Sequence, residues 1–231
     1  MKLLAVAATM IISATAMLAD TAEKNLAESA RVFSEVMATP DKGIPQDLLD
    51  KAQCVMILPG LKKAAFVVGG EYGRGFVTCR NHSGTGWGAP AAIRMEGGSI
   101  GFQIGGSSTD IIMLVMNQHG LDELLSDKFT LGADASVAAG PVGRTANANT
   151  DVKLNAEILA WSRSKGLFAG VSLNGATVRN DLDDNQALYG RKMTNKEVIM
   201  SDLKPPATAM PLIHELDKYS MRSNADRSKD H

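Results

Sequence analysis

One motif in the chain could place a nucleophilic serine: Gly97-Gly98-Ser99-Ile100-Gly101, which reads G-x-S-x-G. In a nucleophile elbow this serine stands on a sharp turn between a strand and a helix, and a histidine with an acidic partner activates it. His119 is the candidate base, and Asp122 or Asp134 could orient it. The residues that follow, 102–106, are β-like and end in two glycines, so we interpret the motif as a hairpin turn. A serine hydrolase that uses Ser99 and His119 remains the alternative function.

A second stretch, Ser162-Arg163-Ser164-Lys165, fits the pattern S-x-x-K. That chemistry needs serine and lysine on one helical turn together with S-D-N and K-T-G partner motifs, which the chain lacks. In a strand, Ser162 and Lys165 would point to opposite faces. Four histidines and two cysteines are scattered without the spacing of metal ligands, so we expect no metal and no cofactor. These patterns favour a binding protein over an enzyme.

The remaining candidates are cations beside glycine-rich turns or aromatic residues. The formal net charge of −1 provides no global basic field, so we expect no nucleic-acid partner. A cation beside glycines can bind a phosphate together with backbone N–H groups, and each contributes about 1 kcal/mol near an anionic surface. We predict that these cations converge on one anionic head group; the alternative is that nearby carboxylates pair with each of them. The predicted site residues are Lys62, Lys63, Arg74, Arg144, Arg163 and Lys165.

The elements that position these side chains are predicted to be mostly strands. From 54 to 117, short apolar runs are broken by glycine pairs, which is typical of an antiparallel meander. Residues 111–116 are apolar throughout and predict a central strand buried on both faces. Further strands are predicted at about 130–138, 157–163 and 168–179. The fold class is therefore α+β, a single domain dominated by antiparallel β-sheet, sandwich or barrel-like, with flanking helices at both ends.

Helical periodicity predicts the elements that flank the sheet. Asp183 and Gln186 are placed as a capping box for one of these helices. The predicted helices are 20–38, 46–52, a short one within 117–127, 183–189, 195–203 and 208–219. The domain boundaries follow as a signal peptide at 1–19, a binding domain at 20–203, and a C-terminal helix with a disordered tail at 204–231.

The N-terminus has the layout of an export signal. Lys2 is followed by the apolar run 3–12 and by the small-x-small site Ala14-Thr15-Ala16, so cleavage is expected after Ala16 or Ala19. The apolar run is too short to span a membrane. We predict a periplasmic or secreted protein that associates peripherally with a membrane.

The two cysteines, Cys54 and Cys79, each lie in a short β-like run. In an oxidising compartment an even count indicates one disulfide, and cross-strand pairing of the two runs is geometrically plausible. Two buried free thiols are the alternative. This pairing would accompany the predicted export.

Three glycine-rich stretches have a common character: few bulky side chains and isolated Arg or Lys residues. They are 62–80 (KKAAFVVGGEYGRGFVTCR), 129–144 (FTLGADASVAAGPVGR) and 156–176 (AEILAWSRSKGLFAGVSLNGA). They resemble the SYLF family of lipid-binding domains, and the resemblance runs from about Asn25 to Lys192. It implies a module that binds phosphorylated or otherwise anionic phospholipid head groups, as eukaryotic members bind phosphoinositides and some associate with actin. Within this family, the chain resembles bacterial members that are exported and stand alone. An envelope scaffold that acts through protein contacts is a further alternative function.

The first predicted helix departs from what this resemblance implies. Eukaryotic relatives are thought to insert an amphipathic N-terminal helix into the membrane. The polar face here is mainly acidic and would be repelled by anionic lipid. Its charged residues are Asp20, Glu23, Glu28 and Glu35 against Lys24 and Arg31. We therefore predict that this helix packs on the core.

Overall fold

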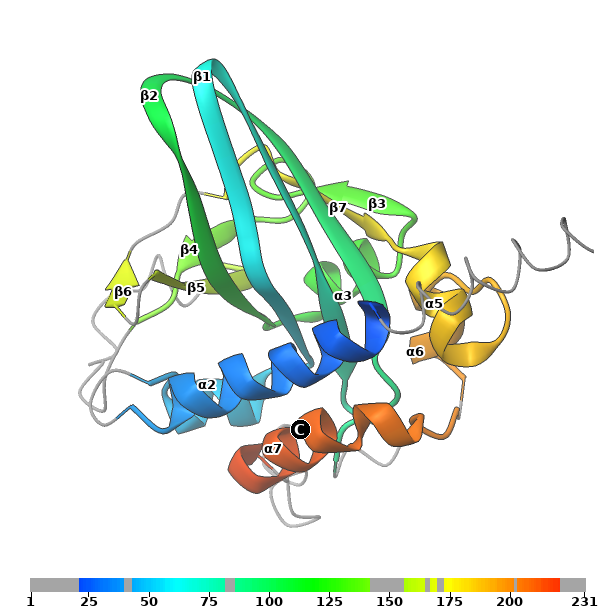
Figure 1. Cartoon of the computed structure of the whole chain (residues 1–231). Coiled ribbons are helices and arrows are strands. Elements are labelled where there is room, and N and C mark those ends of the chain that lie inside the picture. The colour runs from blue at the N-terminus through cyan, green and yellow to red at the C-terminus, as the bar shows by residue number, and fades with distance from the viewer. Residues whose placement is uncertain are drawn as a thin grey trace, which may run out of the picture.

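The computed structural model describes residues 21–39, 43–81, 86–141, 156–164, 167–169, 173–201 and 203–220, with side chains except at 64–68, 99–106 and 167–169. The predicted α+β fold, dominated by antiparallel sheet and flanked by helices, is confirmed (Figure 1). The predicted signal peptide and the C-terminal tail lie outside the described residues. Among the described helices, none has the length and apolar character needed to cross a membrane.

Two very long strands form the centre of the fold. β1 (Cys54–Cys79) and β2 (Ala91–Val115) pair antiparallel along almost their entire lengths, and the ribbon they form folds back at its tip (Figure 1). The predicted meander of short strands was wrong here. Gly69–Gly70 and Gly97–Gly98 do not end strands, because they lie within the ladder, with Gly70 opposite Gly98. The register shifts at two places, between Leu58 and Leu61, where Gly60 has φ 62°, and between Ala65 and Val67.

Folding β1 back on itself brings its two limbs into backbone contact. A Cβ atom at Gly75 would lie 2.0 Å from the carbonyl oxygen of Ile57, and one at Gly73 would lie 2.7 Å from the Leu61 side chain. Glycine is needed because the limbs leave no space for a side chain between them. At the base of the ribbon, the Sγ atoms of Cys54 and Cys79 are 2.02 Å apart, at disulfide distance.

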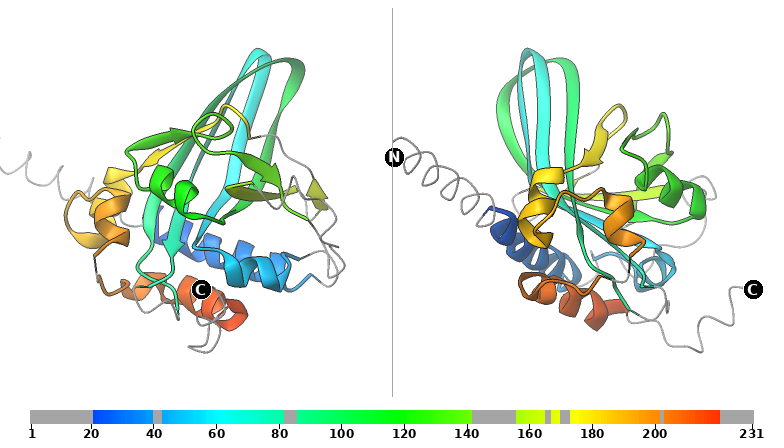
Figure 2. Two further views of the ribbon diagram at one scale, coloured as in Figure 1. Left: turned by 180° about the vertical axis from the view of Figure 1, so that it is seen from behind. Right: turned by 90° about the vertical axis from the view of Figure 1, so that its right-hand side faces the viewer.

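The remaining strands extend the curved sheet from both limbs of β2 (Figure 2). On one side β5 (Ile158–Ser164) pairs with β2 and carries β4 (Val137–Ala139) in parallel and β6 (Leu167–Ala169) antiparallel. On the other side β7 (Thr177–Asn180) pairs with β2 and carries β3 (Lys128–Thr130). The described sheet therefore has the order β3-β7-β2-β5-β4, and only β4 is parallel to its neighbour.

Two of the predicted strands are interrupted. The strand expected at about 130–138 is β3 and β4 separated by a turn, in which Gly132 has φ 82°. The strand expected at 168–179 contains two strands, β6 and β7, and Gly175, with φ 86°, lies in the turn before β7. A left-handed backbone cannot continue a β ladder, which explains both interruptions.

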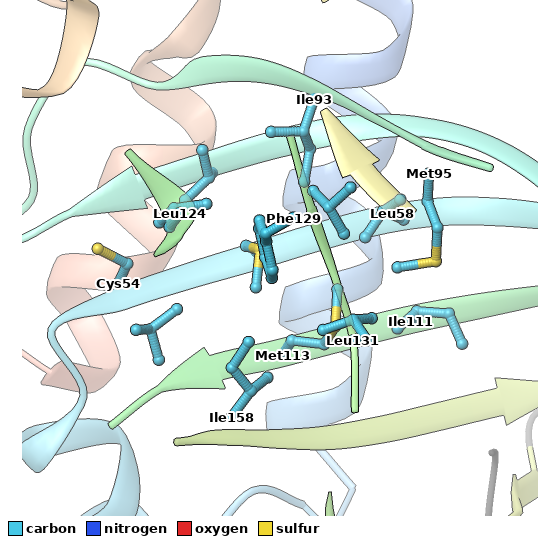
Figure 3. Close-up of a cluster of buried hydrophobic side chains, with 14 of the residues drawn as sticks. Cys54, Leu58, Ile93, Met95, Ile111, Met113, Leu124, Phe129, Leu131 and Ile158 are labelled. Carbon is cyan, nitrogen blue, oxygen red and sulfur yellow. The ribbon is translucent and has the colours of Figure 1, made fainter. Parts of the chain in front are cut away.

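Successive side chains along the ribbon are buried in two different hydrophobic cores. The inner core lies within the curled sheet and includes Leu58, Met95, Met113 and Phe129 (Figure 3). The second core lies between the sheet and the helices, and Ile57, Ile112 and Leu114 contribute to it. Residues 111–115 are at most 2% exposed, which confirms the predicted central strand buried on both faces.

The helices 21–37, α2 (Gln46–Lys51) and α7 (Met210–Ser220) cover this second core (Figure 1). Leu26, Phe33 and Val36 of the first helix are buried, which confirms its predicted packing on the core. The other described helices are α3 (Gln118–Leu124), α5 (Leu182–Tyr189), α6 (Asn195–Ile199) and the short η1 (Ala207–Ala209).

The cap of α5 differs from the prediction. The expected capping box of Asp183 and Gln186 is wrong: Asp181 is the N-cap, and its side chain accepts a hydrogen bond from the Asp184 backbone. A capping box does occur at α6, where Thr194 and Glu197 bind each other's backbone N–H groups.

Candidate functional site

Ser99 does not occupy a nucleophile elbow. It lies within β2 opposite Gly69, and the ladder continues on both sides of it, so neither the predicted hairpin turn nor the strand-to-helix turn of a hydrolase is present. His119 lies on α3, where its Nδ1 is 2.7 Å from Glu157 Oε1. Within the described residues no metal could be held by three or more His, Cys, Asp or Glu side chains. The hydrolase interpretation therefore loses the local geometry on which it depends.

Arg163 ties the first helix to the sheet. Its side chain is only 12% exposed, and Nη2 lies 2.5 Å from Glu35 Oε2 and 3.1 Å from Asp110 Oδ2. The hydrogen bond from Arg163 lowers the pKa of Glu35. Asp110 also accepts a hydrogen bond from the Gly60 N–H at 3.0 Å. The guanidinium thus joins helix 21–37, β5 and β2 in one ion-pair network.

Arg74 faces a buried acidic pair at the start of α5. Its Nη1 lies 3.0 Å from Asp184 Oδ1 and its Nε 3.4 Å from Asp181 Oδ2, while Nε also donates to the Tyr72 hydroxyl. Burial raises the pKa of Asp184 to about 6, with the neighbouring Asp181 charge adding to the rise and Arg74 opposing it. One arginine therefore contacts two adjacent carboxyl groups.

This pair should make stability depend on pH. The folded-state pKa of Asp184, about 6, exceeds its ordinary 3.8, so the stability it contributes is complete below pH 3.8 and is lost as pH rises through 6. We expect the free energy of unfolding to fall over this window by at most about 3 kcal/mol, and Asp184→Asn to remove the fall. Urea unfolding at a series of pH values measures it. Asp183→Asn, at an exposed position of the same helix, is the control, and an unchanged pH profile in Asp184→Asn would contradict the assignment.

The two lysines of β1, Lys62 and Lys63, differ in whether a carboxylate pairs with them. Lys63 Nζ lies 2.7 Å from Glu71 Oε2, on the other limb of the same strand. Lys62 is exposed and makes no ion pair with any residue that the structure describes. It lies directly opposite Ser108, and Lys63 opposite Ser107; both serines are exposed. The Lys62 ammonium group and the Ser108 hydroxyl group are thus neighbours on one face of the ribbon, and the serines were missed because they lie far from the lysines in sequence.

The structure does not bring the described cations into one pocket. Arg144 and Lys165 lie outside the described residues. Arg74 binds α5 and Arg163 lies on β5, and these elements are on opposite sides of the ribbon (Figures 1 and 2). Three of the four described cations have carboxylate partners, as the alternative interpretation expected. A role of these residues in lipid binding stays a prediction.

The described part of the chain is a domain of one class: a curved, mostly antiparallel sheet flanked by helices, with cations on its surface. The chain belongs to the Ysc84 (SYLF) family, whose model, described as "Las17-binding protein actin regulator", matches residues 96–219. It is similar to "LAS seventeen-binding protein 3" of Saccharomyces cerevisiae, with 36% identity over 180 residues, which is 77% of this chain and 39% of the relative. It is also similar to human "SH3 domain-containing YSC84-like protein 1", with 32% identity over 200 residues, 85% of this chain and 58% of the relative. The chain thus spans only part of the relatives it matches.

Proposed function

We propose that this chain binds anionic phospholipid head groups at a membrane surface in an extracytoplasmic compartment and catalyses no reaction. The observation that carries the proposal is the exposed pair of Lys62 and Ser108, which lie directly opposite one another and so share one face of the ribbon. Ammonium and hydroxyl groups are the donors that phosphate and carboxylate oxygens accept. Membership of the Ysc84 (SYLF) family supports the proposal, because resemblance to that family implies a lipid-binding module.

The compartment is part of the same proposal. The export layout of residues 1–19 and the disulfide-distance pair Cys54 and Cys79 both fit an oxidising location outside the cytoplasm. The bacterial origin expected from the sequence belongs to the proposal as well. Las17 binding and actin regulation, which the family description names, are the alternative function through protein contacts.

Co-sedimentation with vesicles tests the function. The chain should sediment with phosphatidylcholine vesicles that contain phosphatidylserine, less so as salt rises, and not with phosphatidylcholine vesicles. Lys62→Ala should weaken this binding about fivefold, since one surface cation contributes about 1 kcal/mol. Lys196→Ala removes the same charge from exposed α6 and should have little effect. Equal sedimentation with both vesicle types would reject the proposal.

A further inference from the structure

Four basic side chains lie in one line across the sheet. In the ladders, Arg74 is directly opposite Arg94, Arg94 is opposite Arg179, and Arg179 is opposite Lys128. Residues directly opposite one another project from the same face of a sheet. We call Arg74, Arg94, Arg179 and Lys128 the basic row. Three of its members were not among the predicted site residues, because only the strand register brings them together.

The basic row faces away from the inner core. The residues that alternate with it along the strands, such as Met95, Val178 and Phe129, are buried within the curled sheet. Figure 3 shows Met95 and Phe129 inside that cluster. The exposed fractions of the three arginine side chains are 28%, 32% and 35%, and Lys128 is exposed. The row is therefore open to solvent.

Arg74 already has two carboxylate partners, Asp181 and Asp184, so the positive charge that is only partly neutralised lies on the other three members of the row. Glu96 is shared by two arginines, with Oε1 3.2 Å from Arg94 Nε and Oε2 3.3 Å from Arg179 Nη1. Arg94 Nε is buried and makes no hydrogen bond to any described residue. Lys128 has no ion pair within the described part of the chain. Because like charges directly opposite one another destabilise a sheet, an arrangement that retains them favours an external anion.

The shape of the row favours a surface of anions over a single one. Neighbouring strands are about 4.8 Å apart, so four strands span about 14 Å, which is longer than one phosphate group. The row lies on the outer face of a sheet rather than in a concave pocket of the kind that small ligands use. In the next row toward the tip of the ribbon, Tyr72 is 44% exposed. Tyrosine is enriched at membrane interfaces, where its ring and hydroxyl face different environments.

We propose that the basic row is the face with which this chain lies on an anionic bilayer. Arg94, Arg179 and Lys128 contact the anionic groups of several lipids, and Tyr72 lies at the level of the head groups. This inference rests on the proposed function and names its docking surface. It places that surface on the limb of the ribbon that carries β7 and β3, beside α5 (Figure 1).

The test compares two double variants of equal charge. Arg179→Gln with Lys128→Gln alters the basic row, and Lys196→Gln with Lys204→Gln alters exposed lysines elsewhere. With phosphatidylserine-containing vesicles, the row variant should bind about 25-fold more weakly, about fivefold for each cation, and show a shallower salt dependence, while the control keeps wild-type binding. Urea unfolding checks that both variants fold. If the row variant does not fold, Lys128→Glu at the exposed end of the row serves in its place, with Lys196→Glu as its control.

The outcomes separate this inference from the proposed function. Wild-type binding that is lost in Lys62→Ala but kept in the row variant would overturn the row and leave the function standing. Absence of wild-type binding to anionic vesicles would overturn both. Full competition by inorganic phosphate at the concentration of the lipid head groups would indicate a single-phosphate site and overturn the docking surface. Binding of duplex DNA as tight as binding of vesicles would overturn it in favour of a polyanion site.

Discussion

Gly75→Ala is expected to destabilise the fold by about 4 kcal/mol or more, which would leave little folded protein. The new Cβ would lie 2.0 Å from the Ile57 carbonyl oxygen and 2.8 Å from Leu58 Cα. Both are backbone atoms within a paired strand, so they cannot move aside as the end of a flexible side chain could. Separating the limbs of β1 would disturb both cores at once, because Ile57 and Leu58 belong to different cores.

Gly98→Ala is the matched control for this change. Gly98 also lies within the ribbon, but a Cβ atom there would meet nothing within 4 Å. We expect its free energy of unfolding to stay within about 1 kcal/mol of the wild type. Urea unfolding of the two variants measures the difference. A Gly75→Ala protein as stable as Gly98→Ala would show that the limbs are not in backbone contact.

Arg80→Met is expected to lower the free energy of unfolding by about 3 kcal/mol. Arg80 donates hydrogen bonds to the backbone carbonyls of Leu49, Ala52 and Ser220, and its guanidinium lies 3.8 Å from the centre of the Trp87 ring. Methionine fills similar space but leaves these carbonyl oxygens without that donor. The change should loosen α2 and α7 from the base of the ribbon together.

Unfolding in urea, followed by tryptophan fluorescence, measures this loss. Arg80→Lys should recover only part of the stability, because an ammonium group cannot reproduce the planar fork of donors. Lys196→Met, at an exposed position of α6, is the control for removal of one positive charge. If Arg80→Met and Lys196→Met unfold at the same urea concentration, the network does not stabilise the helices.

Sequence patterns predicted the parts of the fold that depend on local chemistry. The helical spacing of Leu26, Ala30 and Phe33 indicated a helix that packs on the core, and the apolar run 111–116 indicated a doubly buried strand. The long strands were missed because glycine pairs usually end strands, whereas here Gly70 and Gly98 stay in the ladder opposite one another. Pairing between two strands distant in sequence is a tertiary event with no local signal.

The candidate site was harder to predict for the same reason. Cations could be recognised by type, but their partners are distant in sequence: Arg163 binds Glu35, and Arg74 binds Asp184. The line from Arg94 to Arg179 exists only through the register of β2 and β7. Pattern reasoning thus nominated charged residues as candidates without knowing which of them had carboxylate partners.

Because the ribbon of β1 and β2 contributes side chains to both cores, insertions and deletions in its gene segment are constrained. At 54–58 and 111–115, successive side chains alternate between the two cores, so inserting or deleting one codon in either segment would exchange their destinations. Compensation would need a matching change of length in the paired strand. Single-codon indels should therefore be eliminated from these segments during descent, while point substitutions that conserve volume persist.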